Sequence, residues 1–445
     1  MPTTPPMSTT PDSTPSSAVQ PKATAAIVAA VVLCRIAVGA VFMLSGWAKA
    51  VDPWGFVFKV EEYIAVWGGH LPREVVLAAC VALSAIEFST GLQIALGCFK
   101  RLAVWVAAAM MVFMLPLTAY IAIASPVNDC GCFGDFLHIS NTATFAKNLV
   151  IAALIVVLIK YNRRVRGLYP APVQWLVIVG ALGYPLVLSF IGYQVQPVVD
   201  FRPFPVGSDI FHGTIASDGS EAQGFIYEKD GERRTFALDA LPDSTWTYVD
   251  AAGGNADNGH AAIAVRDSDG DDVADDIVDT DNGAPQAWLI ITAPDVQFLS
   301  SARFLERLNR YFADRDVEFT AIAAGRGADE WRELTRPQFD VYSSEDTALK
   351  ELVRGDAALI YTRGGVIQWK LSLTALDRHI VDDSDTSRNF ADSITPVDNG
   401  HAAWFLTAIL AAWLIVVGLL GQSPKMLRAI GNLNRRVLSR FPKNS

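Results

Sequence analysis

Six long apolar runs are the feature that most constrains how this 445-residue chain can fold. A helix needs roughly 20 mostly apolar residues to cross a bilayer, and each run is close to that length or longer. Hydrophobic residues make up 51% of the chain and charged residues only 18%, which is too apolar for an ordinary soluble protein of this length. The sequence therefore predicts an α-helical membrane protein in contact with lipid, with spans over residues 25–47, 75–97, 102–124, 142–161, 173–195 and 402–420.

Basic residues between the spans predict the orientation, because short cytoplasmic loops carry an excess of Lys and Arg. Such residues lie between the second and third spans, between the fourth and fifth, and after the sixth. The loop over residues 125–141 has no Lys or Arg, and residues 196–401 are rich in acids. We therefore expect a multi-pass protein of the plasma membrane, with both termini cytoplasmic and residues 196–401 extracytoplasmic.

Acidic residues outnumber basic ones, and the formal net charge is −10. Proteins that bind nucleic acid favour basic stripes, so no nucleic-acid partner is expected. The run over residues 267–271 looks like a calcium loop, but its Gly270 comes fourth instead of sixth and the bidentate glutamate is missing. We predict a solvated turn there and no metal site.

Residues 196–401 are predicted to form a water-soluble region between the fifth and sixth spans. Its first part is β-rich, and residues 225–238 are typical of a hairpin that turns at Asp230-Gly231. Further on, strand-like and helix-like segments alternate, which indicates an α/β sandwich. Strands are expected at 287–292, 317–323, 357–361 and 366–370, and helices at 298–312, 328–334 and 347–353. This order resembles thioredoxin, but the region contains no cysteine and cannot carry out thioredoxin's own chemistry.

Two of the five cysteines, Cys130 and Cys132, lie in the loop after the third span with only Gly131 between them. As a redox pair they would alternate between dithiol and disulfide, and glycine permits the unusual backbone of so small a ring. As a metal site they would need nearby groups such as His138 and the flanking acids, and as a static turn the thiols would be idle. We favour the redox pair over the static turn, and both over metal, since an outward loop faces an oxidising compartment.

Charged residues also occur inside the first two spans. A charge near the bilayer centre costs a few kcal/mol on insertion scales, so it should face the bundle interior and find a partner. Arg35 and Lys49 share one helical face of the first span, and Glu87 lies in the middle of the second. We expect Arg35 to pair with Glu87, either as a pocket for a substrate or quinone head group or as a structural ion pair. Residues 54–67, which mix aromatic and charged side chains, are typical of an interfacial helix.

The first-span motif and the CGC loop together resemble the DoxX/MauE superfamily, in which MauE is the methylamine utilisation membrane protein. The match covers roughly residues 25–165 and rests on Arg35, Gly39, Phe42, Ser45, Gly46, Lys49, Asp52-Pro53, Glu61-Glu62-Tyr63, Glu87, Gly91 and Cys130-Gly131-Cys132-Phe133-Gly134. The resemblance implies a four-helix bundle, here with two further spans and an inserted extracytoplasmic thioredoxin-like domain. It also implies extracytoplasmic thiol–disulfide chemistry, with Cys130 and Cys132 as the redox pair and Arg35, Lys49 and Glu87 lining the bundle.

Two hypotheses from different classes follow. In the first, the outward cysteine pair exchanges electrons between the thiols of an extracytoplasmic client protein and a membrane acceptor, possibly a quinone, without a tightly bound cofactor. In the second, the protein is a non-catalytic membrane scaffold that binds a partner through its outer domain. Both share one layout: a disordered tail (1–24), a four-helix domain (25–165), a fifth span (173–195), a β-rich region (196–286), a thioredoxin-like domain lacking CxxC (287–380), a linker (381–401), a sixth span (402–421) and a basic tail (422–445).

Overall fold

A computed structural model gives the structure of the protein. It describes residues 25–69, 71–124, 131–136, 139–194, 196–197, 199, 202, 204–212, 224–229, 232–237, 247–252, 263–279, 283–292, 301–325, 327–382, 385, 389–393, 399–425 and 428. The tail over residues 1–24 and the basic tail beyond residue 428 lie outside these ranges.

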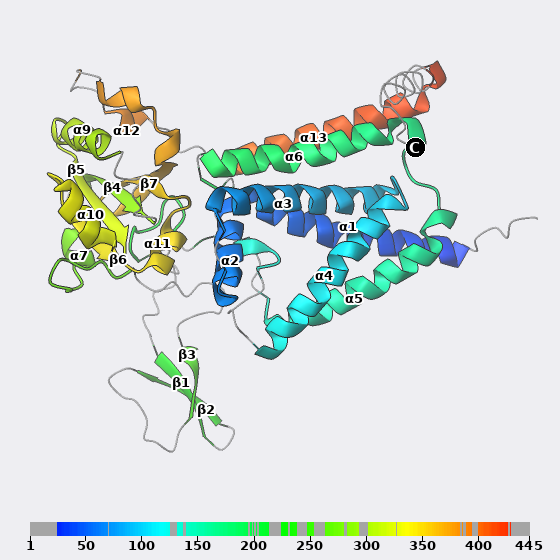
Figure 1. The fold of residues 1–445 in the computed structure, drawn as a ribbon, viewed down its shortest axis with the longest axis horizontal. Coiled ribbons are helices and arrows are strands. Elements are labelled where there is room, and N and C mark those ends of the chain that lie inside the picture. The colour runs from blue at the N-terminus through cyan, green and yellow to red at the C-terminus, as the bar shows by residue number, and fades with distance from the viewer. Residues whose placement is uncertain are drawn as a thin grey trace, which may run out of the picture.

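Six helices are long and apolar enough to cross a membrane, which confirms the six predicted spans. They are α1 (Ala25–Val51), α3 (Arg73–Leu96), α4 (Leu102–Ala124), α5 (Asn141–Tyr161), α6 (Gln174–Gln194) and α13 (Asn399–Gln422). Figure 1 shows α1 and α3 side by side in the middle, with α6 and α13 along one flank and α4 and α5 on the other. The predicted interfacial helix is α2 (Pro53–Val66), which crosses the end of the bundle nearest the outer domain.

Glycines let α1 and α3 pack very closely. A Cβ atom added to Gly46 would lie 2.5 Å from the Phe88 backbone nitrogen, and one added to Gly39 would lie 2.8 Å from the Gly91 carbonyl oxygen. Small residues at such contacts allow two membrane helices to approach backbone to backbone. The same contacts fix the antiparallel register, in which Gly39 faces Gly91 while Gly46 faces Ser84 and Phe88.

The Gly46→Leu variant is therefore expected to lose about 1–3 kcal/mol of stability or more, because the new side chain meets backbone that cannot move aside. Thermal unfolding of the purified protein in detergent measures this loss. Gly183→Leu is the matched control, since Gly183 lies in the membrane helix α6 with open space around its Cβ position. Equal melting temperatures for the two variants would contradict the close α1–α3 contact.

The α/β domain, which is inserted between α6 and α13, contains a five-stranded sheet of order β6-β5-β4-β7-β8. β4 (Pro285–Ile291), β5 (Glu318–Ala324) and β6 (Val341–Ser344) are parallel, whereas β7 (Ala357–Arg363) and β8 (Val366–Ser372) form an antiparallel hairpin beside β4. Helices α9 (Ala302–Ala313) and α10 (Gly327–Thr335) contribute to one hydrophobic core, and α11 (Asp346–Leu352) contributes to the other. These elements confirm the predicted strands and helices, and β6 is an additional edge strand.

Segments far from the sheet in sequence complete its second core. Phe204 and Phe211, from the stretch after α6, are fully buried there together with Val265 and Trp288. The backbone of residues 207–210 also bonds to β8 and to its turn. The predicted turn over residues 267–271 is an exposed turn, in which Asp267 Oδ1 accepts hydrogen bonds from the backbone of Asp269 and Asp271.

A separate three-stranded sheet lies outside the α/β domain (Figure 1). β1 (Gly224–Lys229) and β2 (Glu232–Ala237) pair antiparallel, as the predicted hairpin requires, and β3 (Thr247–Ala252) pairs with β1 on its other side. The predicted turn residues Asp230-Gly231 lie outside the described residues. The hairpin prediction is confirmed, and β3 is an addition.

The segment just before β7 attaches the α/β domain to the membrane bundle. Arg354 Nε donates to Asp52 Oδ2 at 2.8 Å, and both side chains are under a tenth exposed. Asp356 forms a second ion pair with Arg73 at the start of α3. Gln196 bonds both the carbonyl oxygen and the amide of Arg354, each at 3.0 Å. Since Asp52 also caps α2, one carboxylate joins α2 to the α/β domain.

Candidate functional site

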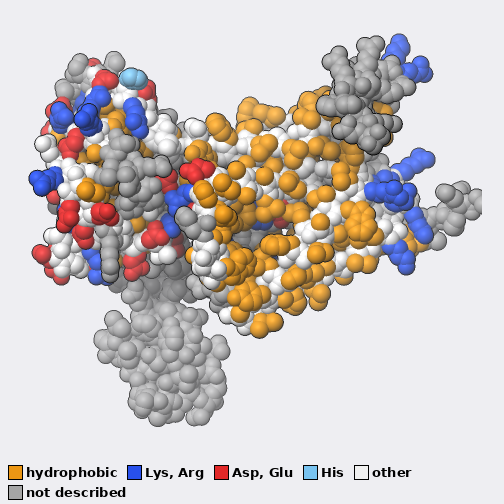
Figure 2. Space-filling model, in the orientation of Figure 1, with side chains coloured by type: hydrophobic (Ala, Val, Ile, Leu, Met, Phe, Trp, Pro, Cys, Tyr) orange, Lys and Arg blue, Asp and Glu red, His pale blue; other side chains and the backbone are white. Residues whose placement is uncertain are grey.

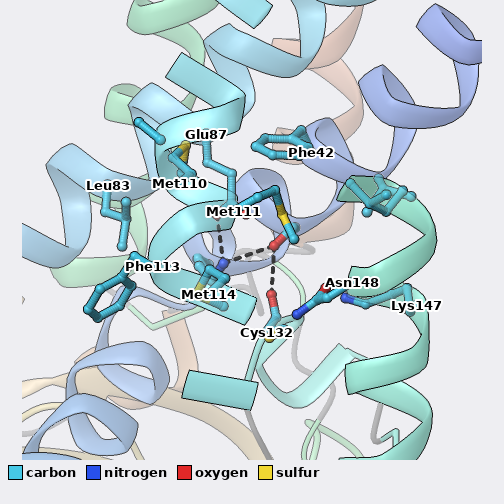
Figure 3. A pocket seen from close by; sticks show the side chains of 15 residues that line it. Phe42, Leu83, Glu87, Met110, Met111, Phe113, Met114, Cys132, Lys147 and Asn148 are labelled. Carbon is cyan, nitrogen blue, oxygen red and sulfur yellow. Dashed lines mark hydrogen bonds and ion pairs between the residues drawn. The ribbon is translucent and has the colours of Figure 1, made fainter. Parts of the chain in front are cut away.

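A cavity of about 400 Å³ lies within the bundle, between α1, α3, α4 and α5 (Figure 3). Its wall is mostly apolar, and its largest apolar side chains are Phe42, Met110, Met111, Phe113, Met114 and Ile151. Flexible methionines and aromatic rings suit an apolar ligand whose shape they can follow. The polar lining residues are Ser45, Lys49, Glu87, Lys147 and Asn148, and Cys132 completes the site. A largely apolar pocket with a few polar groups is the usual form of a small-molecule site.

Three of the polar side chains, Glu87, Lys49 and Ser45, form a continuous chain of hydrogen bonds that ends at the Cys132 backbone (Figure 3). Lys49 Nζ lies 2.6 Å from Glu87 Oε2 and donates to Ser45 Oγ at 2.9 Å. Ser45 Oγ in turn donates to the carbonyl oxygen of Cys132 at 2.7 Å. Lys49 is only 5% exposed and Glu87 12%, so water screens this ion pair little. The chain connects a carboxylate on α3 to the cysteine loop through side chains of α1.

The cavity is open to lipid between α3 and α4. Leu83 of α3 is 40% exposed and Phe113 of α4 is 64% exposed, and both line it. They lie on the same side of the cavity in Figure 3. In a bilayer these exposed apolar side chains face acyl chains, so a lipid-soluble molecule can reach Lys49 and Glu87 without passing through water.

The cysteine loop is packed against the bundle. Cys132 and Phe133 are buried beside Ile121 at the end of α4, and Lys147 Nζ lies 4.3 Å from the centre of the Phe133 ring. Gly131 has a φ of +64° and packs on the side chain of Lys59 from α2, so a larger residue there would be both strained and obstructed.

Cys130 lies outside the described residues, as do Asp129 and His138. A disulfide between Cys130 and Cys132 therefore stays a prediction. What the structure adds is the position of Cys132, on the wall of a cavity that also contains the Lys49–Glu87 pair.

The expected pairing of Arg35 with Glu87 is wrong. The register set by Gly39 and Gly46 places Glu87 level with the Ser45–Lys49 turn and places Arg35 beside Gly97, so Lys49 is the partner of Glu87. Arg35 lies in the N-terminal half of α1, and it is not among the residues that line the cavity.

Arg35 instead holds the loop after α5. It donates to the Asn162 side chain at 2.6 Å and to the carbonyl oxygens of Asn162, Val165 and Arg166 at 2.9–3.0 Å. The hydrogen bonds of this buried guanidinium therefore go mostly to backbone carbonyl oxygens, and the role of Arg35 is structural.

Several site residues were not predicted. Ser45 belongs to the first-span motif but had no assigned role, and the methionines of α4 look like ordinary lipid-facing residues in sequence. Lys147 and Asn148 could have been recognised in the sequence as candidate site residues, because they are adjacent polar residues in an apolar span. Asn148 Nδ2 donates to Thr118 Oγ1 at 3.3 Å, and this hydrogen bond joins α5 to α4 at the cavity wall.

Together the six helices indicate a multi-pass membrane protein, and the cavity between four of them is its candidate ligand site. Residues 26–161 match the family described as methylamine utilisation protein MauE, so this membrane segment is similar to that family. Residues 224–252, which include β1 to β3, match a second family, a domain of unknown function (DUF8463). No curated protein and no solved structure matches the chain.

Proposed function

We propose that this protein takes part in extracytoplasmic thiol–disulfide redox chemistry, with Cys130 and Cys132 as the redox pair and a quinone as electron acceptor. The observation that supports it is the position of Cys132 on the wall of a cavity that opens to lipid and contains a buried ion pair. A quinone has a polar head and an apolar tail, which suits a pocket that combines a few polar groups with methionines and aromatic rings.

The proposed reaction balances without further reactants. Oxidation of the two thiols forms one S–S bond and releases two electrons and two protons. The quinone takes up two electrons and two protons and becomes a quinol. Lys49 and Glu87 are ionisable groups in hydrogen-bond contact, so they can position the head group and exchange protons with it. Thiols of a client protein would then reduce the disulfide and complete the cycle.

The proposed orientation has the outer domain extracytoplasmic. Figure 2 shows Lys and Arg side chains clustered at the end of the hydrophobic bundle that is opposite the α/β domain. Arg101, Arg163 and Arg164 are among the exposed basic residues of that end. Because Lys and Arg accumulate on the cytoplasmic side, the cysteine loop and the α/β domain would share the oxidising side.

We assign the α/β domain a thioredoxin-like fold without thioredoxin chemistry. Strands β5-β4-β7-β8 lie in the order expected of such a fold, with β4 and β5 parallel and the β7–β8 hairpin antiparallel. Residues 196–401 contain no cysteine, so a client-binding role is proposed for this domain. The same observation favours the second candidate function, a non-catalytic scaffold in which the CGC loop is a structural turn.

Alkylation in intact cells tests the redox proposal. A membrane-impermeant maleimide should label Cys130 and Cys132 only after reduction, and the purified protein should reduce a soluble quinone analogue when supplied with a dithiol. Cys130→Ser and Cys132→Ser should each abolish quinone reduction. Cys34→Ala is the matched control, because Cys34 lies in α1 and does not line the cavity.

Retention of full quinone reduction by the Cys130→Ser/Cys132→Ser double variant would rule out the redox role. If that variant also complemented a deletion strain, the scaffold function would replace it. The matched family takes its name from methylamine utilisation, so growth on methylamine is the first phenotype to score.

A further inference from the structure

A second hollow, of about 370 Å³, lies at the turn between α3 and α4, which is at the end of the bundle opposite the α/β domain (Figure 1). It is lined by the turn between α3 and α4 and by the loop after α5: Phe99, Lys100, Arg101, Leu102 and Arg163. Three of its five lining residues are cations, and the proposed redox function uses none of them.

The charge around this hollow is not neutralised. No Asp or Glu occurs over residues 97–102 or 160–174. Within the described residues, the side chains of Arg101 and Arg163 have neither a hydrogen-bond nor an ion-pair partner. Arg35 adds a further buried cation whose hydrogen bonds all go to carbonyl and amide oxygens. Burial lowers the pKa of Lys100, and the nearby positive charges of Arg35 and Arg163 lower it further.

The backbone that carries these cations is held firmly. Phe99 adopts a φ of +39°, and its amide donates to Gln174 Oε1 at 2.9 Å. Asn162 Nδ2 donates to the carbonyl oxygen of Lys100 at 3.1 Å, and Lys100 Nζ donates to Val165 at 2.9 Å. Since Arg35 holds Asn162 and Val165 as well, both walls of the hollow are fixed before any ligand arrives.

Apolar side chains continue the hollow toward the membrane. Leu102 and Trp105, on the first turn of α4, are 59% and 61% exposed. An exposed tryptophan at a helix end is typical of the membrane interface, where lipid head groups meet acyl chains. A ligand with an anionic head and an apolar tail would satisfy both parts of this surface.

We propose that Lys100, Arg101 and Arg163 form a binding site for the phosphate group of an anionic phospholipid, such as phosphatidylglycerol. Guanidinium groups bind phosphate oxygens through charge-assisted, often paired hydrogen bonds. Basic pockets between membrane helices on the cytoplasmic side are suited to such head groups.

Native mass spectrometry of the full-length protein, titrated with short-chain phosphatidylglycerol or phosphatidylcholine, tests this site. We expect one phosphatidylglycerol to bind in preference to phosphatidylcholine, and Arg101→Gln or Arg163→Gln to weaken its binding by on the order of tenfold or more, as for hydrogen bonds to a charged group. Arg164→Gln is the matched control, because Arg164 packs over the Tyr161 ring and does not line the hollow. It should weaken binding by no more than about fivefold, which is the effect of one cation near an anionic surface.

The bound phosphate group could belong to a lipid or to free inorganic phosphate, and competition with inorganic phosphate distinguishes the two. Failure of millimolar phosphate to displace phosphatidylglycerol would identify the lipid as ligand, and displacement that is sensitive to Arg163→Gln would identify free phosphate. Equal losses for Arg163→Gln and Arg164→Gln, or no preference for phosphatidylglycerol, would overturn the proposal. Because Arg101 and Arg163 support no other contact, their variants should fold, and size-exclusion chromatography confirms this.

Discussion

Lys49→Met is expected to destabilise the protein by about 3–5 kcal/mol, because it leaves the Glu87 carboxylate buried without its cation. Lys49→Met/Glu87→Met should recover much of that loss, since replacing both members of a buried ion pair by apolar residues is often neutral. Thermal unfolding in detergent measures both effects.

The double variant separates structure from function. If the pair serves the proposed quinone chemistry, the double variant should fold but reduce quinone poorly, whereas a purely structural pair would leave activity near that of the natural protein. Lys147→Met is the matched control, because Lys147 lines the same cavity and contacts a ring instead of an acid. A stability loss for Lys147→Met as large as that for Lys49→Met would contradict the assigned partner.

Arg354→Met is expected to release the α/β domain from the bundle, because it leaves the buried Asp52 carboxylate without its cation. Removing one member of a buried ion pair costs about 3–5 kcal/mol of stability. Hydrogen exchange should then increase in α2 and in residues 353–356, while the sheet core stays protected. Arg332→Met is the control, since Arg332 forms a more exposed ion pair with Asp329 within the α/β domain.

Asp52→Asn refines this prediction. Asparagine caps helices about as well as aspartate, so this variant keeps the α2 cap and removes only the charge. If hydrogen exchange increases in Arg354→Met and returns to its original rate in Arg354→Met/Asp52→Asn, the effect is due to the ion pair. Unchanged exchange in Arg354→Met would show that other contacts hold the domain.

The membrane spans could be predicted from the sequence because their signal is local. Each span is a run of about 20 apolar residues, and no information about its neighbours is needed. The antiparallel pairing of β1 with β2 was predictable for the same reason, since an Asp-Gly pair between two strand-like segments is a local hairpin signal. The position of Cys132 in the connection between α4 and α5 was likewise readable from the sequence, although Cys130 itself lies outside the described residues.

The partner of Glu87 could not be predicted in this way. Arg35 and Lys49 share a helical face, so periodicity alone does not choose between them. The choice depends on how far α1 slides along α3, which the backbone contacts of Gly39 and Gly46 determine. Likewise, Asp52 and Arg354 lie 302 residues apart, and no local pattern connects them. The edge strand β6 was missed because its sequence, Val-Tyr-Ser-Ser, is short and half polar.

The α/β domain is inserted between α6 and α13, and this affects how firmly it stays in contact with α2. These two helices pack along each other, with Tyr184 and Thr407 in hydrogen-bond contact at 2.8 Å and Trp413 Nε1 donating to the Leu176 carbonyl oxygen at 2.9 Å. Both ends of the domain are therefore tethered at neighbouring points, and its local concentration above α2 is on the order of millimolar. A free protein that competes for the α2 surface must overcome this intramolecular advantage, whereas the domain itself needs only a weak contact to stay in place.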